Sequence, residues 1–214
     1  MNISENIKKI TAEIPDNITI VGVTKYVDTN VAEELYQNGI THLGENRVDV
    51  FLEKYHAIKT KPVWHFIGTL QSRKVKDIIN KIDYLHSLDR LSLADEIQKR
   101  ADKRIKCFVQ VNVSDESSKH GLELSEVGTF ISQLSDHDKL EVVGLMTMAP
   151  DTEDAELIRS CFAKLKMVQK EVQKMNLVYA PCTELSMGMS NDYQIAVEEG
   201  ATFVRLGRIL IGSE

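Results

Sequence analysis

The sequence has few cysteines and no long apolar run. Its three cysteines, Cys107, Cys161 and Cys182, are scattered and form no CxxC pair, which argues against a disulfide framework and leaves no zinc signature. No apolar run approaches the ~18 residues of a membrane-spanning helix. The first residues, MNISENIKKITAEI, lack an apolar leader core and predict a capped amphipathic helix instead. We therefore expect a soluble, cytoplasmic protein.

Positive charge is not in excess either. The chain has 26 Lys and Arg against 32 Asp and Glu, a formal net charge of −6. The broad basic surface of nucleic-acid-binding proteins is therefore not expected. The sequence contains no HExxH, P-loop or GxGxxG pattern, and no His or Cys at metal-ligand spacing. We expect a single globular domain over residues 1–214, without linkers or repeats.

Strand-like and helical segments alternate along most of the chain. Helical periodicity is seen in segments such as TNVAEELYQNG and DAELIRSCFAKLKMVQKEV. The predicted helix N-caps are Asp28-Thr29, Asp89 and Asp151 to Asp154, and the predicted helix ends are Gly39 and Gly200. Alternating strands and helices predict a parallel sheet, and eight strands favour a closed (β/α)8 TIM barrel over an open, doubly wound sheet. The predicted fold is thus α/β, a single barrel with an extra N-terminal helix. The predicted strands are 18–27, 42–47, 63–68, 84–89, 106–114, 141–149, 183–188 and 202–209.

One residue of the first predicted strand, ITIVGVTKYV, does not suit a protein core. Strand alternation places Lys25 on the same face as Val21 and Val23. A buried lysine tends to lose its proton, and a neutral amine at the mouth of a barrel can attack a carbonyl group to form a Schiff base. Alternatively, the side chain reaches water or pairs with a carboxylate. The position of Lys25 alone leaves both interpretations open.

The last two predicted strands are followed by loops of a kind that binds phosphate in many barrels. Ser186 and Ser190 offer hydroxyl groups around Gly188, and the segment SND can cap the next helix so that its free N–H groups point at an anion. Gly207 permits a close backbone approach, and Arg208 could add positive charge. A plain helix cap and a turn glycine are the alternative.

An amine on the first strand and a phosphate site at the last two suggest one ligand across the mouth of the barrel. Pyridoxal 5′-phosphate (PLP) has an aldehyde and a phosphate on opposite sides of one ring. Its ring nitrogen then needs a partner, and Arg205, two residues before Gly207, is suitably placed.

Seven ordered motifs carry a family resemblance: VGVTKYV, HLGENRV, WHFIGTLQSRKVK, LHSLDR, QVNVS…KHGL, GLMTMAP and ELSMGMSNDYQIAVEEGATFVRLG. From about residue 18 to its end, the chain resembles the YggS/PROSC-type PLP homeostasis proteins. That family is similar to the barrel domain of alanine racemase, the fold type III of PLP proteins. The resemblance implies a cofactor-binding set of Lys25 as the PLP lysine, Arg205 facing the pyridine nitrogen, Ser186, Ser190, Gly207 and Arg208 around the phosphate, and Asn46, His65 and Met146 along the ring. Many relatives have a small hydroxyl residue where this chain has Arg208, so the backbone at Gly207 is the firmer phosphate contact.

The expected site argues against robust catalysis. PLP enzymes that use the ring as an electron sink generally place a carboxylate on its nitrogen, whereas an arginine stays charged and only donates. Alanine-racemase-like enzymes take a second base from another domain, and this chain ends soon after the last predicted strand. We therefore expect a non-catalytic, monomeric protein that buffers or delivers PLP, with PLP-dependent or PLP-forming enzymes as candidate partners. The alternatives are a small amino-acid racemase or lyase with His65 as second base, and a cofactor-free Schiff-base aldolase.

Overall fold

Eight parallel strands close into a barrel in the computed structural model, which describes residues 2–114 and 120–212. Each strand pairs with the next along the chain, β4 pairs with β5, and β9 returns to pair with β1. The predicted (β/α)8 barrel is confirmed. Its strands are β1 (Thr19–Val23), β2 (His42–Glu45), β3 (Val63–Phe66), β4 (Tyr84–Leu88), β5 (Ile105–Asn112), β7 (Leu140–Met146), β8 (Glu184–Ser186) and β9 (Phe203–Leu206).

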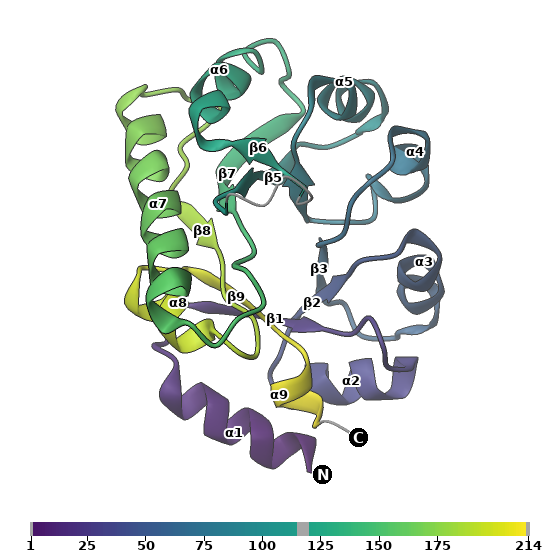
Figure 1. Ribbon diagram of the computed structural model, residues 1–214. Coiled ribbons are helices and arrows are strands. Elements are labelled where there is room, and N and C mark those ends of the chain that lie inside the picture. Colours follow the sequence, from purple (N-terminus) through teal and green to yellow (C-terminus); the bar gives the residue numbers. More distant parts are fainter. Residues whose placement is uncertain (1, 115–119, 213–214) are drawn as a thin grey trace.

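Helices surround this barrel, as Figure 1 shows in a view along its axis. Among the described residues, none of them is both long and apolar enough to cross a membrane. The helices are α1 (Ile3–Glu13), α2 (Thr29–Gln37), α3 (Val48–Ala57), α4 (Val75–Ile78), α5 (Leu91–Arg100), α6 (Val127–Ser132), α7 (Ala155–Lys174), α8 (Tyr193–Glu198) and α9 (Arg208–Ile211), with 3-10 turns at Ser72–Lys74 and Leu124–Glu126.

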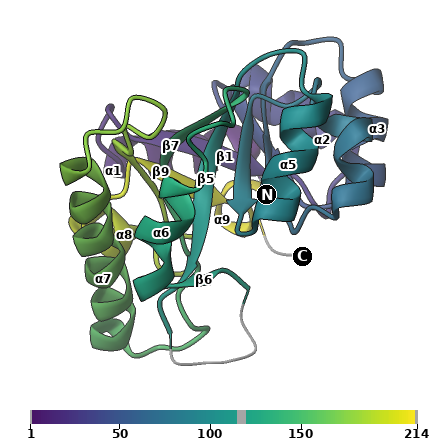
Figure 2. The same ribbon diagram turned by 90° about the horizontal axis from the view of Figure 1, so that it is seen from above.

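The expected N-terminal helix is α1. The side chain of Asn2 caps it by accepting a hydrogen bond from the backbone N–H of Glu5, and Ile3, Ile7 and Ile10 are buried beneath it. It lies beside α9 (Figures 1 and 2), to which it is tied by a hydrogen bond of 3.1 Å from Asn6 Nδ2 to the carbonyl of Leu210.

The strands separate two apolar cores, because successive side chains of a strand point to opposite faces. The larger core lies between the strands and the helices and contains residues such as Leu43, Phe51 and Leu185. The smaller core fills the interior of the barrel and consists of Val21, Phe108, Val143, Met146 and Phe203, with Tyr84 packed against it. Val21 thus faces the interior, on the face that strand alternation predicts for Val23 and Lys25.

Several of the predicted helix ends are confirmed. The carboxylate of Asp28 accepts a hydrogen bond from Val31 N at 3.0 Å, and Asp154 caps α7 in the same way. Gly39 and Gly200 follow α2 and α8 with φ of 101° and 99°, a conformation that favours glycine. The cap predicted at Asp89 is wrong: its carboxylate accepts from Arg90, the residue at the cap position of α5.

The first strand is shorter than predicted. It ends at Val23 rather than at residue 27. The backbone N–H of Thr24 still donates to the carbonyl of Gly44, but that of Val27 donates to the carbonyl of Thr24, so the chain turns there. A further short strand, β6 (Leu122–Glu123), pairs with β5 and was not predicted, because two residues give no periodic pattern.

Candidate functional site

Lys25 lies in the loop between β1 and α2, at the carboxyl ends of the strands, where barrels of this type bind their ligands. Its side chain is exposed, and Nζ lies 4.7 Å from the centre of the Tyr26 ring. The expected apolar surroundings of this amine are therefore wrong. The loop lifts Lys25 out of the sheet after Val23, whereas the apolar pattern of the sequence continues through it.

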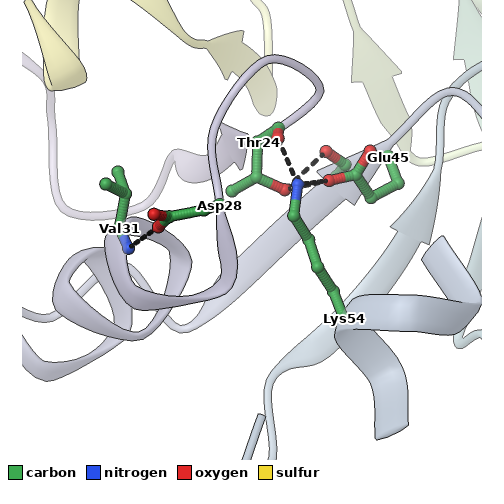
Figure 3. Close-up of polar contacts among 6 residues, drawn as sticks. Thr24, Asp28, Val31, Glu45 and Lys54 are labelled. Atoms are coloured by element: carbon green, nitrogen blue, oxygen red, sulfur yellow. Dashed lines mark hydrogen bonds and ion pairs between the residues drawn. The ribbon is translucent and has the colours of Figure 1, made fainter. Parts of the chain in front are cut away.

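A buried ion pair supports this loop from below (Figure 3). Lys54 extends from α3 and donates hydrogen bonds to Glu45 Oε1 at 2.6 Å and to the carbonyl of Thr24, the residue before Lys25. Thr24 Oγ1 also donates to Glu45 Oε1. Glu45 and Lys54 are 0% and 2% exposed. Lys54 was not predicted as a functional residue, although its spacing of three residues from the buried Phe51 places both on one helix face.

Arg205 projects from β9 into the barrel and is 4% exposed. Its Nη1 donates to Ser186 Oγ at 2.5 Å, and its Nη2 donates to the carbonyl of Thr147 at 2.9 Å. Burial lowers the pKa of the guanidinium to about 10, against the opposing effect of the nearby carboxylate of Asp192. Arg205 therefore remains a cation and a donor at neutral pH, held at a fixed position in the interior of the barrel.

The loops after β8 and β9 meet at Ser190. Its Oγ accepts hydrogen bonds from the backbone N–H groups of Gly207 at 3.3 Å and Ile209 at 3.4 Å. Arg208, between them in sequence, has an exposed side chain. Two backbone donors, a hydroxyl group and a nearby arginine form a donor set that suits a phosphate group.

Gly188 and Gly207, in these two loops, differ in how much room neighbouring protein atoms leave for a side chain. Gly188 has φ of 95°, and a Cβ added there would lie 2.6 Å from Ala196 Cβ, so its own surroundings demand glycine. A Cβ on Gly207 would come no closer than 3.4 Å to another atom, Val23 O. Protein packing thus leaves room at Gly207, which fits a close approach by a ligand.

The predicted helix cap in SND takes a different form. Asp192 occupies the cap position of α8, but its side chain makes no hydrogen bond to that helix. Asp192 Oδ1 instead accepts from Met189 N at 2.6 Å and so closes the loop itself. Burial raises the pKa of this carboxyl group, partly offset by that backbone bond.

Ser186 stands apart from the Ser190–Gly207 pair. It is completely buried, and its Oγ contacts Arg205 and, at 2.9 Å, His86 Nδ1. The structure thus places its hydroxyl group beside the predicted ring-nitrogen partner, and a contact with phosphate stays a prediction.

The three residues expected along the ring lie at different depths. Asn46 directly follows β2 and is half-buried, and its backbone carbonyl oxygen packs against Gly68. Met146 ends β7 and is 1% exposed in the inner core. His65 lies deeper, stacked on the Tyr84 ring at 4.4 Å and hydrogen-bonded to two other histidines, and it connects to Arg205 only through His86 and Ser186. Its contact with a ligand stays a prediction.

Comparison with known proteins gives the family. The family described as "Alanine racemase, N-terminal domain" matches residues 1–214. A pyridoxal phosphate homeostasis protein of Aquifex aeolicus is 43% identical over 197 residues, which cover 90% of this chain and 86% of that protein. This chain belongs to the pyridoxal phosphate homeostasis proteins of the alanine racemase N-terminal domain family. The human protein of that name is 33% identical, over 98% of this chain and 83% of its own length.

Solved structures of other proteins share the barrel. PipY of Synechococcus elongatus PCC7942, with PLP bound, matches with a TM-score of 0.92 and 30% identity over 99% of this chain and 100% of its own. An alanine racemase of Corynebacterium glutamicum has a TM-score of 0.83 at 14% identity, and the match covers 61% of that enzyme. This second likeness concerns the fold alone.

Proposed function

We propose that this protein binds PLP at the carboxyl-terminal mouth of its barrel and acts in PLP homeostasis by buffering or delivering it, without robust catalysis. One observation carries the proposal: the exposed amine of Lys25 shares this mouth with the phosphate-suited donors at Ser190 and Gly207. The presence of PLP in the related PipY structure supports the choice of ligand.

The proposed attachment is a Schiff base on Lys25. Its amine adds to the aldehyde carbon of PLP, a carbon–nitrogen double bond forms, and the aldehyde oxygen leaves as water. The exposure of Lys25 suits a protein that must load and release its cargo, because an incoming amine or water molecule can reach the link. Rigid support of the loop by Lys54 keeps the amine at the mouth.

The other residues divide the remaining work. Ser190, Gly207 and Arg208 hold the phosphate, Asn46 and Met146 line the ring, and Arg205 donates to the ring nitrogen. Because Arg205 remains charged, it keeps that nitrogen unprotonated and weakens the ring as an electron sink. A carrier needs no such sink.

The proposal also includes the setting in which the protein acts. We propose one domain over residues 1–214, a monomer in the cytoplasm, and exchange of PLP with PLP-dependent or PLP-forming enzymes. The three cysteines are buried and none forms a disulfide among the described residues, which suits a reducing compartment.

The visible absorption spectrum of the purified protein with PLP tests the binding site. We expect a yellow band that borohydride abolishes, with the reduced adduct mapped to the peptide containing Lys25. The variant Lys25→Ala loses the band but keeps part of its PLP affinity, since the phosphate donors remain. Lys8→Ala, which removes an exposed lysine of α1, serves as the matched control and keeps the band.

Two results speak against the proposal. A protein that stays colourless with added PLP has no such site. Steady turnover of an amino acid by the pure protein, lost in Lys25→Ala, contradicts the absence of catalysis.

A further inference from the structure

A continuous chain of hydrogen-bonded polar side chains runs through the interior of the barrel to Arg205. His42 Nδ1 lies 2.9 Å from His65 Nε2, and His65 Nδ1 lies 2.8 Å from His86 Nε2. From β4 the chain crosses to β8, where His86 Nδ1 lies 2.9 Å from Ser186 Oγ, the acceptor of Arg205. His65, His86 and Ser186 are fully buried, so bulk water does not compete for these bonds.

The hydrogen bonds couple the positions of the ring protons, because a neutral imidazole has one donor and one acceptor nitrogen. If Ser186 donates to His86, then His86 donates to His65, His65 donates to His42, and every ring is protonated on Nε2. If the direction is reversed, every ring is protonated on Nδ1, and Nε2 of His42 becomes an acceptor. The chain therefore has two self-consistent states.

Both states require neutral rings in the interior. Burial lowers the pKa of His65 and of His86 well below the ordinary histidine value, and the neighbouring imidazoles, and Arg205 in the case of His86, act in the same direction. A proton added to the chain therefore resides at one of its ends rather than on an inner ring.

His42 is the end of the chain that can reach water. It is the first residue of β2, at the amino-terminal base of the barrel, and is half-buried. A cavity of about 190 Å³ opens at this base, lined in part by Tyr84, Phe203, Lys106 and Glu141. The rings of Tyr84 and Phe203 lie 6.4 and 6.5 Å from that of His42.

The charged and titratable groups around His42 come from several elements. They are Asp83 before β4, Tyr84 on β4, Lys106 on β5 and His65 on β3. Burial lowers the pKa of His42, Asp83 raises it, and Lys106 lowers it, with a net lowering.

We infer that His42, His65, His86 and Ser186 act as one positioning unit that couples protonation of His42 at the base of the barrel to the hydrogen bonding of Arg205 at the ligand site. The inference rests on the proposed function, because it places the ring of PLP against Arg205.

Protonation of His42 selects one of the two states. A proton from water adds to His42 Nε2 only when the ring already carries its proton on Nδ1 and donates to His65. His86 then donates to Ser186, whose Oγ accepts from both His86 and Arg205. Relative to the other state, each ring carries its proton on Nδ1 instead of Nε2, and the chain as a whole holds one more proton, which water supplies at His42 Nε2. No inner ring changes its charge.

A ligand on Arg205 biases the same equilibrium. A ring nitrogen that accepts from Arg205 weakens the bond from Arg205 to Ser186, which makes Ser186 Oγ a better acceptor for His86. Binding of PLP then favours the state that His42 protonation selects and raises the pKa of His42. By reciprocity, protonation of His42 strengthens PLP binding by the same factor.

The first test measures the protonated nitrogens in ligand-free protein by ¹⁵N NMR of the histidine rings. We expect His65 and His86 to be neutral and protonated on the same nitrogen, Nδ1 in both or Nε2 in both. Rings protonated on different nitrogens, or a charged inner ring, overturn the inference. PLP plays no part in this measurement, so its outcome is independent of the proposed function.

The second test follows the pKa of His42 by NMR with and without PLP, once absorbance has established saturation. We expect a rise of about 0.5, which corresponds to about threefold tighter PLP binding below the His42 titration than above it. The variant His65→Phe keeps an aromatic ring on Tyr84 and every through-space charge but interrupts the chain, so the rise should vanish. An equal rise in this variant, or none in the parent protein, contradicts the coupling. If the variant does not fold, the tautomer measurement still decides.

Discussion

The ammonium group of Lys54 lies 2.6 Å from Glu45 Oε1, with both side chains buried beneath the loop that carries Lys25. Lys54 also donates to the carbonyl of Thr24, so this ion pair joins α3, the end of β2 and the residue before Lys25. It is thus a structural support for the ligand-binding loop rather than a contact of the ligand.

Removal of one partner of this pair should be costly. Lys54→Met leaves the carboxylate of Glu45 buried without a cation, and we expect the free energy of unfolding to fall by about 3–5 kcal/mol. The double variant Lys54→Met with Glu45→Gln should recover most of that loss, because no unpaired charge remains. Urea unfolding of the parent protein and of each variant measures these free energies. Lys74→Met removes a half-exposed partner of Asp77 at 3.9 Å and should cost less than ~1 kcal/mol. A loss in the double variant as large as in the single one contradicts the argument.

The buried histidines predict a loss of stability in acid. Burial lowers the pKa of His65 and His86 in the folded protein, so below about pH 6.5 the unfolded chain binds protons that the folded protein does not. The free energy of unfolding should therefore be independent of these groups above pH 7 and fall as the pH drops, by ~1.4 kcal/mol per pH unit for each ring. Urea unfolding at several pH values between 5 and 8 checks this slope.

Two glycines should respond to alanine in opposite ways. A Cβ on Gly144 in β7 would lie 2.1 Å from the carbonyl oxygen of Glu184, so the paired strands must move apart, and we expect Gly144→Ala to cost about 1–3 kcal/mol or more. A Cβ on Gly128 in α6 meets nothing within 4 Å, and Gly128→Ala should raise stability by up to ~1 kcal/mol through helix propensity. The midpoint of thermal unfolding of each variant, compared with that of the parent protein, measures the two effects. Equal effects would mean that β7 and β8 are not packed this closely.

The cysteines should be inert in the folded protein. All three are buried, and burial raises the pKa of Cys107 and raises that of Cys182 to about 12, which disfavours the reactive thiolate. A thiol reagent should label none of them at neutral pH and all of them in concentrated urea. Rapid labelling of Cys161 or Cys182 under native conditions would show that α7 or the segment before β8 opens readily.

Much of the architecture follows from the sequence alone. Eight apolar runs separated by helical segments predicted a closed parallel barrel, and alternation placed Val21 on its inner face, where it packs against Phe108 and Phe203. The caps at Asp28 and Asp154 were equally local, because a side chain and a backbone N–H two or three residues away form them. The type of each element, the face of a strand residue and a helix cap depend on residues close in sequence, so they can be predicted from the sequence pattern.

Tertiary structure decided the rest, because its contacts join residues that are far apart in sequence. The apolar pattern predicted a buried Lys25, but a turn after Val23 exposes it, whereas Lys54, which was not predicted, is buried. Ser186 was predicted to lie near the phosphate, and that contact stays a prediction, but only barrel closure brings His86 to its hydroxyl group from 100 positions earlier in the chain. The sequence by itself determined that any polar side chain buried in this barrel, such as those of Lys54 and Ser186, needs a hydrogen-bond partner. Only the closed barrel determined which partner that is.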